Sequence, residues 1–325
     1  MTQFSSTINM KYGVISYPDS INIGDEVQSI ATERLLPKVD YYLPREELNK
    51  PPTDEQVKLI CNGWFMGKPK NWPPANNIHP LFISFHVTNS NNSYKLLPNK
   101  KLVDYYKQFE PIGCRDLKTM EYFKEIGIKA YFSNCITLTL ENQFTKRNDD
   151  ILLVDPLRFN YTKPYRDFLI KGMIPKKYHD AVKFEYQRRK VVDLSREERF
   201  ADAERLIEMY SKAKMVITSR IHVALPCLAL GTPVYFINAG YHSSLFNLND
   251  RFEGIMELFN TIGEDVFPYS SASVFHRAGR GTNLYKLSDM KPLPIDWENP
   301  EPNSDDYLQY SKLLKEKVKE FLTKA

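Results

Sequence analysis

Short apolar runs alternate with amphipathic helical stretches along most of this chain, and this alternation constrains the fold more than any other feature. The run 12–17 precedes a helical stretch over 25–35, and the run 215–218 precedes a short helix that ends near residue 230. Strands that alternate with helices are typical of α/β proteins, in which βαβ units build a parallel sheet. The sequence therefore predicts parallel sheets covered by helices.

Capping residues mark the limits of the predicted helices. Asp116 precedes a helix over 117–126, and Gly127 follows its end. Ser195 opens a capping box in front of a helix over 196–212. Further apolar runs predict strands at 59–62, 81–87, 151–155 and 234–238.

Length and composition fit two domains. The chain has 325 residues, of which 42% are hydrophobic, and a polar stretch near residue 148 separates two α/β halves of similar size. We predict two Rossmann-like domains, 1–148 and 149–298, that face each other across a cleft. Over 299–325, a stretch rich in Pro, Asn and Asp predicts a linker, and apolar residues at helical spacing beyond it predict an amphipathic helix. Ligands bind at the carboxyl ends of the strands in such sheets, so we expect the chemistry in the loops there.

Charge and cysteine usage exclude several classes of function. The net charge is +4, from 44 basic and 40 acidic residues, which argues against a dedicated nucleic-acid binder. The four cysteines are scattered without a CxxC pair, so we expect neither a zinc site nor a disulfide scaffold. We find neither a signal-peptide pattern nor a membrane-spanning run. These features predict a cytoplasmic protein with at most peripheral membrane contact, and they leave its oligomeric state open.

Two loops in the first half combine the end of a strand with the start of a helix. In the loop Asn22 to Asp25, Gly24 allows a tight turn, and the free amides of the following helix can bind a ligand. A simple helix cap at Asp25 is the alternative. The second loop places Arg115 beside a helix N-terminus, which suits an anion, although a structural ion pair of this arginine is equally compatible.

The loop that follows the buried run 215–218 is the most informative. It carries Ser219, Arg220 and His222 at the start of a helix. Arg220 and His222 are two residues apart in a turn, so both side chains can face one ligand, and a cationic pair there suits an anion. A structural histidine is the alternative. His86, near the end of another strand, is a further candidate with the same alternative.

Four cationic residues, two from each half, therefore predict a pocket in the cleft for a small, highly charged anion. No carboxylate cluster in the sequence indicates a bound divalent cation, so the arginines would neutralise the ligand without a metal. We predict no cofactor. The four residues are His86, Arg115, Arg220 and His222.

Six segments of the chain resemble the polysaccharide pyruvyl transferase family. The resemblance runs from about residue 12 to 240, and its most specific part is SRIH…ALGTPV. The segments are NIGDEVQSIAT (22–32), CNGWF (61–65), FISFHV (82–87), GCRD (113–116), SNCITLTL (133–140) and VITSRIHVALPCLALGTPVYFIN (216–238).

This resemblance implies a fold similar to that of the GT-B glycosyltransferases, with the C-terminal helix crossing back onto the first domain. It implies phosphoenolpyruvate as the donor, and as the acceptor two hydroxyls of a sugar in a polysaccharide or its lipid-linked precursor. The products would be a cyclic pyruvate ketal and phosphate. The family's donor-binding histidine, arginine and RxH pair correspond here to His86, Arg115, Arg220 and His222.

Within this interpretation, His222 is the general acid and Arg220 acts beside it in catalysis. The base that deprotonates the sugar is unassigned, with Asp25 and Asp116 as candidates. Further substrate contacts are predicted for Asn22, Gly24, Asp25 and Ser219.

Two other functions fit the same sequence. One is a GT-B-type glycosyltransferase with a nucleotide-sugar donor, because fold alone does not specify the donor. The other is a non-catalytic, anion-binding relative.

The loop 269–282, with His276, Arg277 and Arg280, is either a cover for a phosphorylated or lipid-linked sugar or an ordinary surface loop. The basic residues at 176–177 and 188–190 either touch the inner face of a membrane or lie on a solvated surface.

Overall fold

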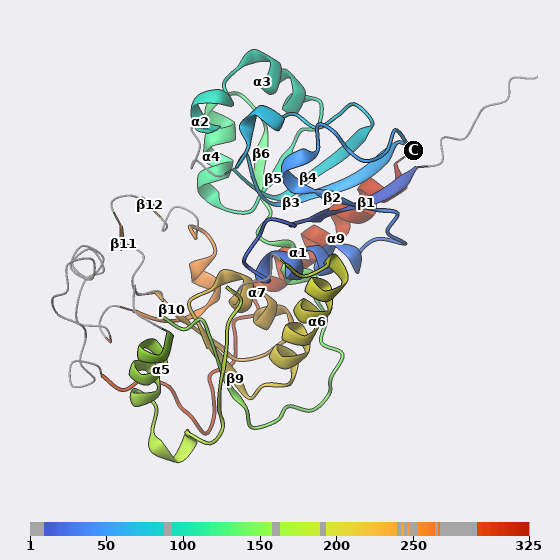
Figure 1. Ribbon diagram of the computed structural model, residues 1–325. Helices are drawn as coiled ribbons and strands as arrows, with labels where there is room; N and C mark the ends of the chain where they lie inside the picture. The colour runs from blue at the N-terminus through green and yellow to red at the C-terminus, as the bar shows by residue number, and fades with distance from the viewer. Residues whose placement is uncertain are drawn as a thin grey trace, which may run out of the picture. The chain divides into compact units, whose positions relative to one another are not determined.

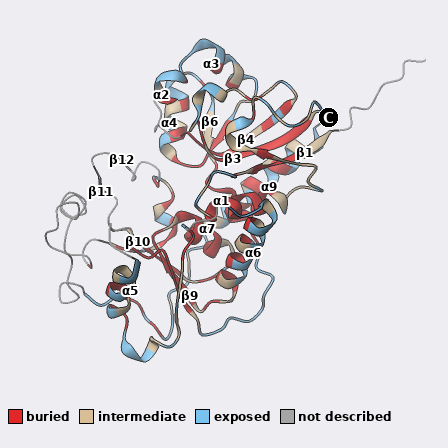
Figure 2. Ribbon diagram, viewed as in Figure 1, coloured by how far each residue is buried: buried red, intermediate tan, exposed pale blue. Residues whose placement is uncertain are grey.

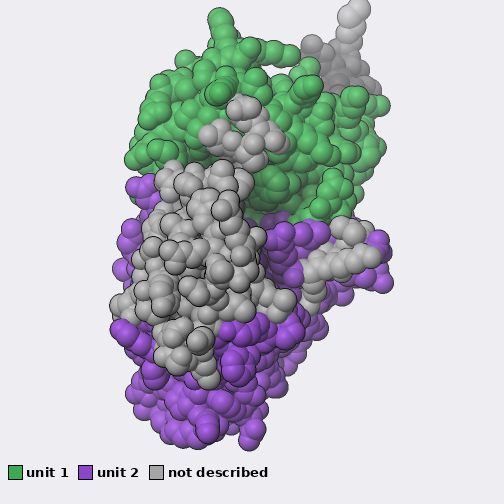
Figure 3. Space-filling view, turned by 60° about the vertical axis from the view of Figure 1, so that its left-hand side comes forward, with its two compact units in different colours: residues 1–20, 28–136, 312–325 green, residues 21–27, 137–311 purple. Residues whose placement is uncertain are grey.

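The computed structural model describes residues 10–87, 93–157, 163–188, 193–238, 242–243, 246–247, 252–263, 266 and 291–324. The chain divides into two compact units, which Figure 3 colours separately. Unit 1 comprises Met1–Ser20, Gln28–Ile136 and Lys312–Ala325, and unit 2 comprises Ile21–Val27 and Thr137–Ser311. The predicted domain limits at 148 and 298 stay a prediction. The loop 269–282 lies outside the described residues.

Unit 1 contains a parallel sheet of six strands in the order β2-β1-β3-β4-β5-β6. The order reverses between β1 and β3, as in doubly wound proteins. The strands are β1 (Lys11–Ser16), β2 (Tyr41–Pro44), β3 (Val57–Phe65), β4 (Ile78–Val87), β5 (Ile112–Cys114) and β6 (Ala130–Phe132).

Helices cover both faces of this sheet. In Figure 1, α2 to α4 lie on one side, and α1 and α9 lie on the other. The core on the first side is aromatic, since Phe85 of β4 lies 6.1 Å, between ring centroids, from both Tyr106 and Phe123. The helices are α1 (Gly24–Glu33), α2 (Ser93–Leu96), α3 (Lys100–Lys107), α4 (Leu117–Glu125) and α9 (Tyr307–Thr323).

Unit 2 contains a second parallel sheet, of five strands in the order β13-β10-β9-β7-β8. Counted from β7 in chain order, this is again the order 2-1-3-4-5, with its reversal between β7 and β9. The strands are β7 (Ile151–Val154), β8 (Val182–Glu185), β9 (Met215–Thr218), β10 (Val234–Ile237) and β13 (Asn260–Ile262). A separate antiparallel pair is formed by β11 (His242–Ser243) and β12 (Phe246–Asn247).

Successive side chains of these strands point to opposite faces of the sheet, and a different layer packs on each face. On one face, Ile151 and Ile217 join a core with Leu169 of α5 and Trp297. Helix α7 packs on β9 and β10 and also contacts α6. Its residues are apolar except for His222, as expected for a core helix, and Figure 2 shows it buried. The helices are α5 (Lys163–Gly172), α6 (Arg196–Lys212) and α7 (Ile221–Ala229).

The predicted α/β class with parallel sheets is confirmed, and several capping predictions are confirmed with it. Ser195 and Glu198 form the capping box of α6, and the Asp116 side chain accepts a hydrogen bond from the Thr119 amide at the start of α4. Gly127 has a φ of 77° after that helix. The GT-B-like arrangement and the return of the C-terminal helix stay predictions.

The strand predicted over 59–62 is longer in the structure, where β3 runs from Val57 to Phe65. The predicted strand ends at Asn62, directly before Gly63. The pairing with β4 shifts register between Cys61 and Gly63, and Gly63 has a φ of 106°. A bulge of this kind allows a strand to continue through a glycine.

None of the helices in the described ranges is both long and apolar enough to cross a membrane.

Candidate functional site

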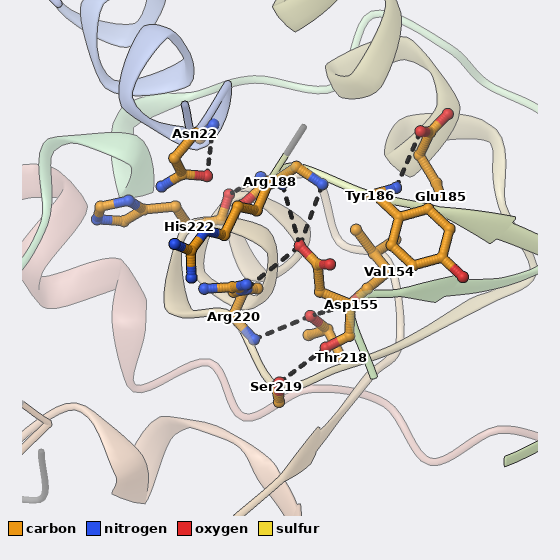
Figure 4. Close-up of polar contacts among 12 residues, drawn as sticks. Asn22, Val154, Asp155, Glu185, Tyr186, Arg188, Thr218, Ser219, Arg220 and His222 are labelled. Atoms are coloured by element: carbon orange, nitrogen blue, oxygen red, sulfur yellow. Dashed lines mark hydrogen bonds and ion pairs between the residues drawn. The ribbon is translucent and has the colours of Figure 1, made fainter. Parts of the chain in front are cut away.

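Asp155 and Arg220 lie where the strand order of unit 2 reverses. Asp155 directly follows β7, Arg220 follows the neighbouring β9, and Val154 pairs with Thr218 in register. The Arg220 Nε donates a hydrogen bond to Asp155 Oδ2 at 3.2 Å, as Figure 4 shows. Asp155 is 4% exposed, and the Arg220 side chain is 20% exposed. A buried carboxylate therefore holds the partly exposed guanidinium at the carboxyl edge of the sheet.

Hydrogen bonds from neighbouring loops fix Asp155 itself. Its Oδ2 accepts from the amides of Gln187 at 3.1 Å and Arg188 at 3.3 Å. The Ser219 hydroxyl donates to the Asp155 carbonyl at 2.7 Å, so it ties the loops after β7 and β9 together. The predicted contact of Ser219 with a substrate stays a prediction. Asp155 was not among the predicted site residues, although its position at the end of the apolar run 151–155 was the available signal.

Helix α7 begins directly after Arg220. The Thr218 hydroxyl accepts from the Arg220 amide at 3.0 Å and donates to the Val154 carbonyl at 2.7 Å, which fixes the turn between strand and helix. His222 is the second residue of α7 and is 7% exposed. The predicted strand, turn and helix start are therefore confirmed.

The loop that contains Asn22 packs against His222. The His222 Nδ1 lies 3.9 Å from Asp25 Oδ1, and both side chains are buried. The Asn22 Oδ1 accepts from the Gly24 amide at 3.2 Å where α1 begins, and Asp25 lies in the first turn of that helix. Asp25 thus stands opposite the imidazole, where a carboxylate can balance the charge of an imidazolium.

Gly24 is needed for a different reason from the turn freedom that the sequence suggested. It is not among the described glycines that have a positive φ. A Cβ at this position would lie 2.6 Å from Gln187 Oε1 and 3.1 Å from His222 Cβ. Gln187 is buried, its Nε2 donates to the His222 carbonyl at 2.8 Å, and its own carbonyl accepts from the Ile23 amide at 3.0 Å. Close packing against the end of β8 and the start of α7 therefore demands glycine.

A buried ion pair anchors the first turn of α1 to α6. The Glu26 Oε1 accepts from Arg199 Nε at 2.7 Å and lies 2.5 Å from Arg199 Nη2. Burial raises the pKa of Glu26 to about 8, although the charge of Arg199 acts to lower it.

His86 and Asp116 form a close pair within unit 1. The His86 Nδ1 lies 2.6 Å from Asp116 Oδ2 and 3.1 Å from Thr119 Oγ1. Burial acts to raise the pKa of Asp116, but the charge of His86 and its hydrogen bond, together with Arg115, outweigh it and lower that pKa. Arg115 is fully buried, and its amide donates to the Phe85 carbonyl at 2.9 Å.

The predicted site residues thus fall into two clusters, each inside one unit. The His86 cluster of unit 1 consists of His86, Arg115, Asp116 and Thr119. The Arg220 cluster of unit 2 consists of Asn22, Gly24, Asp25, Asp155, Gln187, Ser219, Arg220 and His222. The loop 22–25 belongs to the first half by sequence but to unit 2 by its contacts. A single pocket built from both clusters stays a prediction.

A pocket of about 820 Å³ lies in unit 1, at the opposite edge of the sheet from the His86 cluster. Lys58, His79, Phe109, Tyr131 and Phe321 are among its lining residues. These residues lie near the amino ends of β3 to β6 or on α9. None of the predicted site residues is among those that line this pocket.

Comparison with known proteins identifies the family. No curated protein matches the chain. The crystal structure of a functionally uncharacterized protein from Klebsiella pneumoniae subsp. pneumoniae NTUH-K2044 is 16% identical to it. That match covers 78% of this chain and 92% of that chain, with a TM-score of 0.43. The family model described as polysaccharide pyruvyl transferase matches residues 22–241, which is 220 of the 325 residues and includes every predicted site residue. The chain therefore belongs to the polysaccharide pyruvyl transferase family.

Proposed function

We propose that the protein transfers the pyruvyl group of phosphoenolpyruvate to two hydroxyls of a sugar in a polysaccharide or its lipid-linked precursor. The reaction forms a cyclic pyruvate ketal and releases phosphate. Membership of the family supports transfer of a pyruvyl group to a saccharide. The observation that carries the choice of donor is Arg220, which Asp155 holds at the strand ends of unit 2 beside His222.

Arg220 suits one end of such a donor. Phosphoenolpyruvate carries a phosphate and a carboxylate on a three-carbon frame, and guanidinium groups bind both kinds of anion through paired, charge-assisted hydrogen bonds. Asp155 engages the Nε of Arg220. Among the described residues, none engages its two Nη groups, so these donors can bind oxygens of the ligand.

His222 supplies the proton in the proposed chemistry. Protonation of the methylene carbon makes the central carbon electrophilic, and one sugar hydroxyl then attacks it. Phosphate leaves with the electron pair of the C–O bond, and the second hydroxyl closes the ketal ring. The two hydroxyl protons balance the new methyl group and the released hydrogen phosphate. Asp25, 3.9 Å from His222 Nδ1, balances the charge of the imidazolium.

The His86 cluster supplies the proposed base. Asp116 binds the Nδ1 of His86, caps α4 and has a lowered pKa, all of which make it a poor base itself. It orients the imidazole instead, so that Nε2 is the nitrogen that takes the hydroxyl proton. We therefore assign the base to His86 rather than to Asp116. This assignment requires both clusters to reach one donor–acceptor pair.

Phosphate release tests the proposal directly. The purified full-length chain is incubated with phosphoenolpyruvate and a panel of galactosyl, mannosyl and N-acetylhexosaminyl acceptors, and the sugar product is analysed by mass spectrometry. We expect phosphate release that depends on an acceptor and a product that carries a pyruvate ketal. Turnover of nucleotide sugars in a parallel panel would instead indicate a glycosyltransferase. Donor binding without turnover on any acceptor would indicate a non-catalytic relative.

A further inference from the structure

Arg188 lies at the same sheet edge as Asp155 and Arg220. It follows the end of β8 by three residues, and β8 pairs in parallel with β7, with Glu185 opposite Val154. The carboxyl ends of the three neighbouring strands β8, β7 and β9 therefore lead into Arg188, Asp155 and Arg220. Ligands of doubly wound sheets bind at this edge, where the strand order reverses.

Two contacts fix the backbone of Arg188. Its amide donates to Asp155 Oδ2 at 3.3 Å, and this is the oxygen that accepts from Arg220 Nε at 3.2 Å. Arg188 also forms an isolated antiparallel bridge with Asn22. In Figure 4 its side chain extends from the Asp155 carboxylate toward the guanidinium of Arg220 and toward His222. The backbone is thus held while the side chain reaches over the Arg220 cluster.

The local charges leave one positive charge uncompensated. Asp155 compensates one of the two guanidinium groups, and among the described residues no carboxylate pairs with the guanidinium of Arg188. Arg188 is exposed, so water supports its charge in the absence of a ligand. Two guanidinium groups on one side of a single carboxylate attract an anion that carries more than one negative charge.

We propose that Arg188 binds the phosphate of the donor together with Arg220. The proposal rests on the proposed function, because it adds a contact to the same donor. From the sequence alone, Arg188 belongs to a group of basic residues predicted to face a membrane or to lie on a solvated surface. The hydrogen bond of its amide to Asp155 holds its backbone at the sheet edge that carries Arg220, which supports the proposed contact.

Calorimetry on the full chain tests this contact. Arg188→Ala and Arg188→Lys are compared with the unaltered protein and with Lys183→Ala. Lys183 lies near the start of β8, the strand that precedes Arg188, and its exposed side chain pairs with Asp150, so its loss removes the same charge elsewhere. Each protein is titrated with phosphoenolpyruvate and, separately, with inorganic phosphate. Thermal unfolding confirms that each variant is folded.

We expect Arg188→Ala to weaken phosphoenolpyruvate binding about 10- to 100-fold, the loss typical of a charge-assisted hydrogen bond. Arg188→Lys should keep part of the affinity that Arg188→Ala loses, and Lys183→Ala should bind phosphoenolpyruvate as the unaltered protein does. KM for the donor should rise more than kcat falls. Equal binding by Arg188→Ala and Lys183→Ala would overturn the inference. Should the unaltered protein bind phosphate but not phosphoenolpyruvate, the proposed donor is wrong, and the phosphate titrations alone then decide whether Arg188 is an anion ligand.

Discussion

The two sheets of the protein share one strand order but carry their predicted site residues at different strands. In unit 2 the Arg220 cluster lies at β7 and β9, where the order reverses. In unit 1 the order reverses between β1 and β3, yet the His86 cluster lies at the carboxyl ends of β4 and β5, farther along the sheet. The shared strand order therefore does not determine which strand ends carry the predicted site residues. The side chains in the loops decide that.

The two histidines differ in how closely a carboxylate holds them. The His86 Nδ1 is 2.6 Å from Asp116, whereas the His222 Nδ1 is 3.9 Å from Asp25. The hydrogen bond to Asp116 fixes the orientation of the His86 imidazole and places its proton on Nδ1. The other nitrogen, Nε2, can then accept a proton, which suits a base. At His222 the longer distance leaves Asp25 to balance the charge of an imidazolium, which suits the proposed acid.

The largest expected effect is that of His222→Ala. Loss of a general acid typically costs about 10²–10⁴-fold in rate, so kcat should fall on that scale. Steady-state kinetics with saturating phosphoenolpyruvate measure this. His86→Ala is the comparison, and for this variant we expect a shifted pH profile of kcat if His86 is the base. Near-normal turnover of His222→Ala would remove the acid role.

Arg220→Lys should have the next largest effect. Lysine lacks the planar group that binds Asp155 through one nitrogen and a ligand through the others. We expect about 10- to 100-fold weaker donor binding by calorimetry, on the scale of a lost charge-assisted hydrogen bond. Unchanged donor affinity would contradict the assignment of this edge as the donor site.

Gly24→Ala tests the packing of the loop 22–25 within unit 2. A Cβ would lie 2.6 Å from Gln187 Oε1, and overpacking of this kind typically costs about 1–3 kcal/mol of unfolding free energy. Chemical denaturation measures the loss. Gln187→Ala removes the clashing atom, so the double variant should be less destabilised than the sum of the two single variants. Strict additivity would show that Gln187 is not the obstacle.

The smallest effect is a difference in pH dependence between the units. Burial raises the pKa of Glu26 to about 8, so its contribution to stability is present at low pH and is lost as the pH rises toward that value. The pKa of Asp116 is lowered, so its contribution is present at neutral pH and is lost as the pH falls through the folded-state pKa.

Glu26→Gln should therefore gain stability relative to the unaltered protein as the pH rises from about 5 to 8. Asp116→Asn should be less stable than the unaltered protein at neutral pH and approach it in acid. Unfolding free energies measured from acid below pH 3.8 up to about pH 8 check both trends. The same trend in both variants would contradict the assigned shifts.

The sequence predicted local features well because they depend on neighbouring residues. The capping box at Ser195 and the limits of β9 follow from short-range patterns, and the structure has both. The loop after β9 was identified because Arg220 and His222 stand two residues apart at a helix start. Asp155 and Gln187 were missed because their importance comes from contacts across 32 to 65 residues of chain.

The amino-acid sequence by itself determined the alternation of strands and helices, the cationic residues at the strand ends and the family to which they belong. These properties depend on side-chain periodicity and on short motifs, which need no knowledge of distant contacts. The tertiary structure decided which strands are neighbours, and thereby that Asp155 holds Arg220, that Asp116 holds His86 and that Gly24 has no room for a side chain. Those relations arise only when parallel strands far apart in the chain bring their carboxyl ends to one edge.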